Sequence, residues 1–108
     1  MDNNKTLKKL NIKTNDIYIL EDFINNIEYL KIYLYCTISF TDFSDFITKC
    51  NNNNINKLYL LSIIDPEEID QFKNYCEDYL NNKYDITFDI IIDENDDTYY
   101  IIIQINFI

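Results

Sequence analysis

The stretch "INKLYLLSIIDPEEI", residues 55–69, decides the fold, because it joins an apolar run directly to a clear helix start. Residues 55–64 are apolar on both of the faces that a strand presents, as expected of a strand in the middle of a sheet. Asp65 can then cap a helix, Pro66 occupies its first position, and Glu68 completes the spacing of a capping box. A central strand followed by a helix is typical of α/β folds.

The helix predicted after Pro66 extends to about residue 82 and has one apolar side. Its inward positions, at helical spacing, are Ile69, Phe72, Cys76, Tyr79 and Leu80. Its outward positions are Asp70, Asn74, Glu77 and Asp78, with Glu67 in the first turn. Two apolar strands follow over residues 84–93 and 98–107, and the short polar stretch between them predicts an antiparallel hairpin.

The first predicted element is a helix from about residue 15 to residue 31. Asn15 or Asp16 is its candidate N-cap. Its apolar side would hold Ile17, Leu20, Ile24, Ile27 and Leu30. Helical spacing then gives way to alternation over residues 32–40, which indicates a strand with one apolar and one semi-polar side.

A second helix is predicted between this strand and residue 55. Thr41 or Asp42 is its candidate N-cap. Its inward positions are Phe43, Phe46, Ile47 and Cys50. Residues 51–54 are all Asn, which adopts left-handed conformations readily and so ends a helix in a chain that contains no Gly.

Together these elements predict a single small α/β domain in the order αβαβαββ, and an α+β arrangement fits the same pattern. Crossover connections and a final antiparallel hairpin predict a four-stranded mixed sheet. Residues 14–108 would form this domain, and residues 1–13 a flexible basic arm. The order resembles the βαβαββ arrangement of thioredoxin-like domains in the sequence of elements alone, because the CxxC motif of that fold is missing.

The charge of the chain is strongly negative and unevenly distributed. Nineteen Asp and Glu accompany nine Lys, which gives a net charge of −10. Residues 1–13 contain four Lys and one Asp, so residues 14–108 carry a net charge of −13. An AT-rich genome explains the abundance of Ile, Asn, Lys and Tyr, but it enriches Lys as readily as Asp or Glu. The acidity therefore predicts attraction to basic surfaces and repulsion from nucleic acid and anionic membranes.

The three cysteines and the N-terminus predict a cytoplasmic protein. Cys36, Cys50 and Cys76 have no CxxC spacing, and each falls on the apolar side of its predicted element. Buried thiols of this kind are typical of a reducing compartment. The N-terminus lacks the apolar segment of a secretory leader, and no apolar run approaches the length of a membrane span.

The sequence "DENDD", residues 93–97, is the candidate metal site. Asp93, Asn95 and Asp97 match the first half of a calcium-binding loop, but Thr98 replaces its Gly and Gln104 its bidentate Glu. A turn with surplus charge is the simpler interpretation. The chain also has no His to act as a general base and no Gly to form a phosphate-binding loop. We therefore predict no metal, no cofactor and no catalytic residues, so the protein would not be an enzyme.

Tyrosines mark a possible interaction face. Tyr33 and Tyr35 project from the semi-polar side of the strand at 32–40, and Tyr100 projects from the last strand together with Ile102 and Gln104. If the two sides coincide, they form a tyrosine-rich face of the kind that interfaces favour. The favoured alternative is that the first helix packs over them, because three helices need two sheet faces.

The predicted function is that of a small inhibitor that binds a basic protein surface, such as that of a nucleic-acid-binding protein or a nuclease. In size, acidity and lack of catalytic residues the chain is similar to phage anti-CRISPR and other DNA-mimic proteins. The candidate partner-binding residues are Asp93, Glu94, Asp96, Asp97, Glu67, Asp70, Glu77, Asp78, Tyr33, Tyr35 and Tyr100. Two alternatives stay open: an immunity protein that neutralises a cognate toxin, and a homodimerising structural adaptor.

Overall fold

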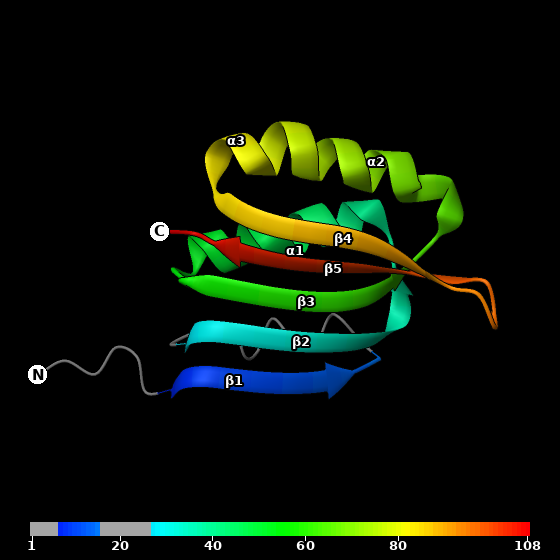
Figure 1. Cartoon of the computed structure of the whole chain (residues 1–108). Coiled ribbons are helices and arrows are strands. Elements are labelled where there is room, and N and C mark those ends of the chain that lie inside the picture. The colour runs from blue at the N-terminus through cyan, green and yellow to red at the C-terminus, as the bar shows by residue number, and fades with distance from the viewer. Residues whose placement is uncertain (1–6, 16–26) are drawn as a thin grey trace, which may run out of the picture.

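Five strands form one mixed sheet in the order β1-β2-β3-β5-β4 in the computed structural model, which describes residues 7–15 and 27–108 (Figure 1). The strands are β1 (Leu7–Thr14), β2 (Ile27–Ile38), β3 (Lys57–Ile64), β4 (Asp85–Asp93) and β5 (Thr98–Asn106). β1, β2 and β3 are parallel, whereas β5 is antiparallel to both β3 and β4. The predicted mixed sheet, its central β3 and its closing hairpin are confirmed.

The predicted order αβαβαββ and the four-strand count are wrong. β1 occupies residues that we assigned to a flexible arm, and β2 begins at Ile27, inside the range predicted as the first helix. Ile27 and Leu30 have helical spacing, but Leu30, Ile32 and Leu34 also continue the alternation of a strand, and all four are buried. Residues 1–6 of the arm and residues 16–26 of the predicted helix lie outside the described residues.

The helices that the structure describes pack on one face of the sheet (Figure 1). They are α1 (Phe40–Asn52) and a longer segment that runs through η2 (Pro66–Glu68), α2 (Ile69–Asn74), η3 (Tyr75–Leu80) and α3 (Asn81–Lys83). The core between the two layers includes the fully buried side chains of Leu30, Ile32, Phe43, Leu58, Leu60, Phe72, Ile101 and Ile103. The prediction that the first helix covers the other face falls mostly on residues 16–26, which lie outside the described residues.

Helix α1 begins earlier than predicted and ends as predicted. Ser39 is its N-cap, because the Ser39 hydroxyl accepts a hydrogen bond from the backbone N–H of Asp42 at 3.1 Å. Thr41 and Asp42 thus lie inside the first turn, and their assignment as caps is wrong. At the other end, Asn54 adopts a left-handed φ of 62°, which confirms the role of the Asn run.

The helix start at Asp65 is confirmed. The Asp65 carboxylate accepts a hydrogen bond from the backbone N–H of Glu67 at 3.0 Å, and Pro66 occupies the first position. The Glu68 side chain does not make the predicted capping-box bond. Its Oε1 instead accepts a hydrogen bond from the backbone N–H of Phe40 at 3.2 Å. This bond joins η2 to the first residue of α1.

The inward positions of the longer helical segment recur every four residues, at Phe72, Cys76 and Leu80, which are fully buried. η3 is π-helical, so its hydrogen bonds span five residues and each turn holds more residues than an α-helical turn. Tyr79 is consequently turned outward and is 49% exposed, which corrects its predicted burial. Its ring stacks on that of Tyr75, with 5.1 Å between the centroids.

Candidate protein-binding surfaces

The carboxylates at the β4–β5 hairpin tip are exposed, except that Asp93 is half-buried. Two of them shape the turn: Asp93 Oδ1 and Asp96 Oδ1 each accept a hydrogen bond from the backbone N–H two residues later, at 3.0 and 3.1 Å. Asp97 adopts a left-handed φ of 56°, which Asn and Asp tolerate, and this supports the interpretation of the stretch as a turn. Turn geometry therefore explains three of these acidic residues and leaves Glu94 as surplus charge.

The four predicted acidic residues of the helical segment, Glu67, Asp70, Glu77 and Asp78, are all exposed. With the four hairpin residues they make up what we call the acidic surface: Asp93, Glu94, Asp96, Asp97, Glu67, Asp70, Glu77 and Asp78. None of these carboxylates forms an ion pair within residues 7–15 and 27–108. Residues 65–108 contain twelve Asp and Glu but two Lys, so this half of the chain has few cations with which to neutralise its own charge.

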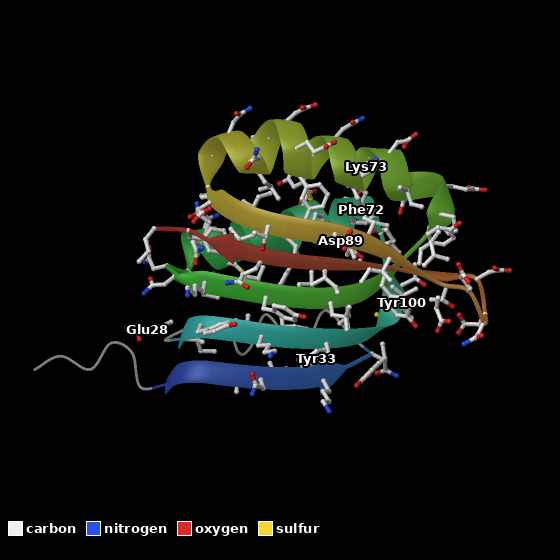
Figure 2. The ribbon with its side chains drawn as sticks, in the orientation of Figure 1. Glu28, Tyr33, Phe72, Lys73, Asp89 and Tyr100 are labelled. Atoms are coloured by element: carbon white, nitrogen blue, oxygen red, sulfur yellow. The ribbon has the colours of Figure 1, made fainter. Side chains whose placement is uncertain are left out.

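The sheet face opposite the helices, which we call the open face, carries the predicted tyrosines. Register pairing places Lys13, Tyr33, Leu61, Ile102 and Asp89 in one row across the five strands. The sides that carry Tyr33 and Ile102 therefore coincide, which is one of the two predicted alternatives. Figure 2 shows Tyr33 and Asp89 of this row on β2 and β4. The first helix predicted to cover this side includes residues 27–31, which instead belong to β2.

Lysines lie beside the tyrosines on the β1–β3 half of the open face. Lys31 Nζ lies 5.5 Å from the ring centroid of Tyr33 and 5.0 Å from that of Tyr59, within the range of cation–π attraction. A hydrogen bond with Tyr33, followed by the charge interaction with the same hydroxyl, raises the pKa of Lys31. This half of the face is aromatic and basic, whereas Asp85, Asp89 and Asp93 carry the opposite charge on β4.

The structure brings only some of the predicted site residues together. Tyr100 pairs with Ile91, two residues before Asp93, so it lies close to the hairpin tip. Tyr35 is 61% exposed where the pairing of β2 with β3 shifts register. The acidic residues of the helical segment belong to the other layer of the molecule. A flat partner surface therefore meets either the helical acids or the tyrosines, with the hairpin tip accessible in both cases.

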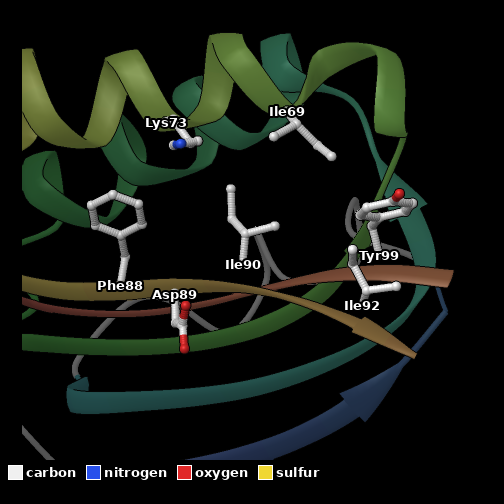
Figure 3. Close-up of a pocket in the computed structure, with 7 residues that line it drawn as sticks. All are labelled: Ile69, Lys73, Phe88, Asp89, Ile90, Ile92 and Tyr99. Carbon is white, nitrogen blue, oxygen red and sulfur yellow. The ribbon is translucent and has the colours of Figure 1, made fainter. Parts of the chain in front are cut away.

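Sequence reasoning missed a groove between α2 and the edge of the sheet (Figure 3). It has a volume of about 430 Å³ and is lined by Ile69, Lys73, Phe88, Asp89, Ile90, Ile92 and Tyr99. Most of this lining is apolar, and the groove follows β4. The signal that could have revealed it is the alternation of acidic and apolar residues along β4, which is typical of a strand with one incompletely covered face.

The grouping of the described Cys, Asp and Glu side chains and the burial of two thiols bear on metal binding and thiol reactivity. Within residues 7–15 and 27–108, no three Cys, Asp or Glu side chains are grouped so that they could hold a metal ion. Cys50 and Cys76 are fully buried, and burial raises the pKa of both thiols, to about 12 for Cys76, which disfavours the reactive thiolate. None of the described helices is both long and apolar enough to cross a membrane.

No protein-family model matches the chain, and neither a curated protein nor a solved structure is significantly similar to it.

Proposed function

We propose that this chain is a non-enzymatic inhibitor that binds a basic surface of a nucleic-acid-binding protein or nuclease. The observation that carries the proposal is the acidic surface, whose carboxylates have no ion-pair partner within the described residues. Like charges held close together repel one another, so an unpaired display of this size destabilises the free chain. The Lys and Arg side chains of a basic partner would offset that repulsion in the complex.

Inhibition by this surface needs no chemical step. The carboxylates would occupy the positions that nucleic-acid phosphates otherwise take on the partner. The bound inhibitor would therefore exclude the nucleic acid. Charges at the rim of an interface act mainly on the rate of encounter, so association should be fast at low salt and should slow steeply as salt screens the attraction. Tyr100, beside the hairpin tip, is the candidate apolar anchor, because tyrosine is enriched among residues that dominate binding energy.

An immunity protein that neutralises a cognate toxin would use the same surface and the same physical chemistry. The identity of the bound partner distinguishes the two: a toxin encoded beside this chain supports the immunity protein, and a host defence nuclease supports the anti-defence inhibitor.

A homodimerising adaptor is a second candidate, and the charge distribution of the open face favours it. Lys13 and Lys31 lie on the β1–β2 side of this face and Asp89 lies on β4. A two-fold axis parallel to the strands would set the basic side of one copy against the acidic side of the other. Sedimentation velocity over a range of protein concentrations tests this candidate, with Ile102→Lys as the variant that should dissociate such a dimer.

The test of the inhibitor proposal compares two variants that each remove four negative charges. The hairpin variant changes Asp93, Glu94, Asp96 and Asp97 to the corresponding amides. The helix variant changes Glu67, Asp70, Glu77 and Asp78 in the same way. Each variant is the matched control for the other, because their net charges are equal and only the position of the change differs.

The partner is first captured on the wild type from host lysate at low salt and identified. Association rates of the purified pair are then measured across a salt series for all three proteins. We expect at least one variant to associate more slowly and with a weaker dependence on salt. Equal rates for all three proteins at every salt concentration would show that the acidic surface does not carry binding.

A further inference from the structure

β4 is an edge strand. It pairs with β5 on one side, and no strand of residues 7–15 or 27–108 pairs with its other side. An edge strand presents unpaired backbone N–H and C=O groups, which soluble proteins usually protect with Lys, Pro, bulges or very short strands. β4 has nine residues in unbroken register with β5 and contains neither Lys nor Pro. Its outer edge is therefore suited to receive another strand.

The side chains of β4 that face the helices are incompletely covered. Ile86, Phe88 and Ile90 are half-buried and Ile92 is 49% exposed, whereas Ile101, Ile103 and Ile105 of neighbouring β5 are fully buried. Ile69 of α2 lies across the groove from these residues (Figure 3). Because the groove follows the edge of the sheet, alternate side chains of an added strand would enter it and complete the apolar core.

The opposite side of β4 carries acidic residues at regular intervals. Asp85, Asp89 and Asp93 are spaced four residues apart on the open face, with Thr87 and Ile91 between them. Four residues of a strand span about 13 Å. An incoming strand with Lys or Arg at every fourth residue would place its cations beside these carboxylates.

We infer that the β4 edge binds an extended segment of a basic protein by strand addition, with Lys or Arg at every fourth residue on one side and aliphatic residues on the other. Main-chain hydrogen bonds to β4 hold the segment, and the groove and the three Asp residues select its sequence. The inference rests on the proposed function, because it specifies which part of the basic partner is bound.

A second copy of this chain is a weaker occupant of the same edge. β1 has a related pattern, since Leu10 and Ile12 pair with buried residues of β2, and Lys9 and Lys13 stand four residues apart at the register positions of Tyr29 and Tyr33. Pairing of β1 with β4 of another copy would, however, be head-to-tail. Such an assembly does not close on itself, so a free β1 edge and a free β4 edge would remain at its two ends. A net charge of −10 on each copy opposes such an assembly.

The probe is a synthetic nine-residue peptide with the sequence Lys-Val-Thr-Val-Lys-Val-Thr-Val-Lys, matched in length to β4. It reads the same in both directions, so it fits a parallel or an antiparallel addition. A control peptide of the same composition places the three lysines next to one another. We expect saturable one-to-one binding of the first peptide, increased protection of β4 amides from hydrogen exchange, and at least about tenfold weaker binding of the control peptide.

Backbone pairing is tested with two further peptides that carry N-methyl groups on one or the other alternate set of amides. Only one set faces β4 in an added strand, so at least one methylated peptide should fail to bind. In the protein, Ile92→Lys places a charge in the groove and should abolish binding of the first peptide. Ile108→Lys, the same exchange at an exposed residue outside β4, should not change it.

Unchanged affinity of both methylated peptides, or equal affinity of the control peptide, would show that attraction is electrostatic alone and would overturn the inference. So would concentration-dependent self-association of the free chain that Ile92→Lys abolishes and Ile102→Lys leaves unchanged, because the edge would then belong to a second copy. If the peptides do not bind β4 while the hairpin or helix variant still slows partner association, the edge inference fails and the inhibitor proposal stands. If the peptides bind β4 but neither variant slows association with the partner, strand addition at the β4 edge stands and the inhibitor proposal fails.

Discussion

Glu68 Oε1 accepts a hydrogen bond from the backbone N–H of Phe40, across 28 residues of chain, at 3.2 Å. The N–H groups of the first turn of a helix have no partner within the helix, and a negative charge near them is favourable. Glu68 therefore stabilises the N-terminus of α1, although it lies in a different helical segment. The ring of Phe40 packs edge-on against that of Phe72, with 5.5 Å between the centroids, so the same place also joins the apolar sides of the two helical segments.

Glu68→Ala should destabilise the fold by about 1–2 kcal/mol, because it removes a hydrogen bond to a charged group and leaves a helix N–H unsatisfied. Glu68→Gln should have a smaller effect, since an amide oxygen still accepts the bond. Urea unfolding monitored by circular dichroism measures both. Glu67→Ala is the control and should change stability by less than about 0.5 kcal/mol, because Glu67 is exposed. Equal losses for the two Ala variants would mean that the bond contributes nothing.

Asp97→Gly should stabilise the hairpin by about 0.5–1 kcal/mol, because Asp97 has a left-handed φ of 56° that Gly adopts without a steric penalty. The variant also removes one charge from a crowded cluster. Asp97→Asn removes the same charge and keeps a residue that tolerates this conformation, so the difference between the two variants isolates the backbone effect. Thermal unfolding of both compares them. A melting temperature for Asp97→Gly below that of Asp97→Asn would contradict the assigned conformation.

Changing Asp93 and Asp96 together to Asn should leave stability within about 0.5 kcal/mol of the wild type, because an amide oxygen can accept the same two turn hydrogen bonds. Changing both to Ala should destabilise the hairpin by about 1 kcal/mol, since the acceptors are lost. The two double variants differ from the wild type by the same charge. Hydrogen exchange of the amides of residues 95 and 98 reports the loss directly, and indistinguishable exchange in all three proteins would show that these bonds do not shape the turn.

The protein should lose stability in alkaline solution. Burial raises the pKa of Cys76 from its ordinary value of 9.0 to about 12 and that of Tyr75 from 10.0 to about 12, and it also raises the pKa of Cys50. A group whose pKa is higher in the folded state stabilises fully below its unfolded pKa, and this contribution is lost as pH rises through the folded value. The free energy of unfolding should therefore fall between about pH 9 and pH 12.

Urea midpoints measured from pH 7 to pH 11 follow this decline. Cys76→Ala should be less stable at neutral pH, because it leaves a cavity, but its stability should fall less steeply above pH 9. If the stability of Cys76→Ala falls with pH as steeply as that of the wild type, ionisation of Cys76 does not cause the alkaline loss of stability. Thiol alkylation at pH 8 gives an independent measure: Cys50 and Cys76 should react far more slowly than Cys36, which is partly exposed.

The parts of the fold that the sequence predicted well are those with long, regular patterns. β4, β5 and the helix start at Asp65 were placed within one or two residues, because alternation and capping chemistry are both local signals. β1 was missed, since an edge strand needs few apolar side chains, and Leu10 and Ile12 alternate with polar residues in a lysine-rich stretch. Ile27 and Leu30 were assigned to a helix because three-residue spacing fits both a helical face and an irregular strand start.

The candidate surfaces were predictable only in part. Exposure of the hairpin and helix acids followed from their positions in short-range patterns. The coincidence of Tyr33 with Ile102 on one face, and the groove between Ile69 and Ile90, depend on the strand order β1-β2-β3-β5-β4. Strand order is set by packing between segments distant in the chain, and a single sequence carries no local signal for it.

The position of β5 between β3 and β4 also has a consequence for the folding pathway. β4 and β5 join through a tight turn and can pair within microseconds, whereas each parallel pairing of β1, β2 and β3 must first close a long connection. We expect the hairpin to form early, β3 to join it together with the helical segment, and β2 and β1 to follow outward. β1 and β4 each pair with a single described strand, but β4 is joined to its neighbour by the tight turn. β1 should therefore be the strand that detaches first from the native protein and exchanges its amide hydrogens fastest.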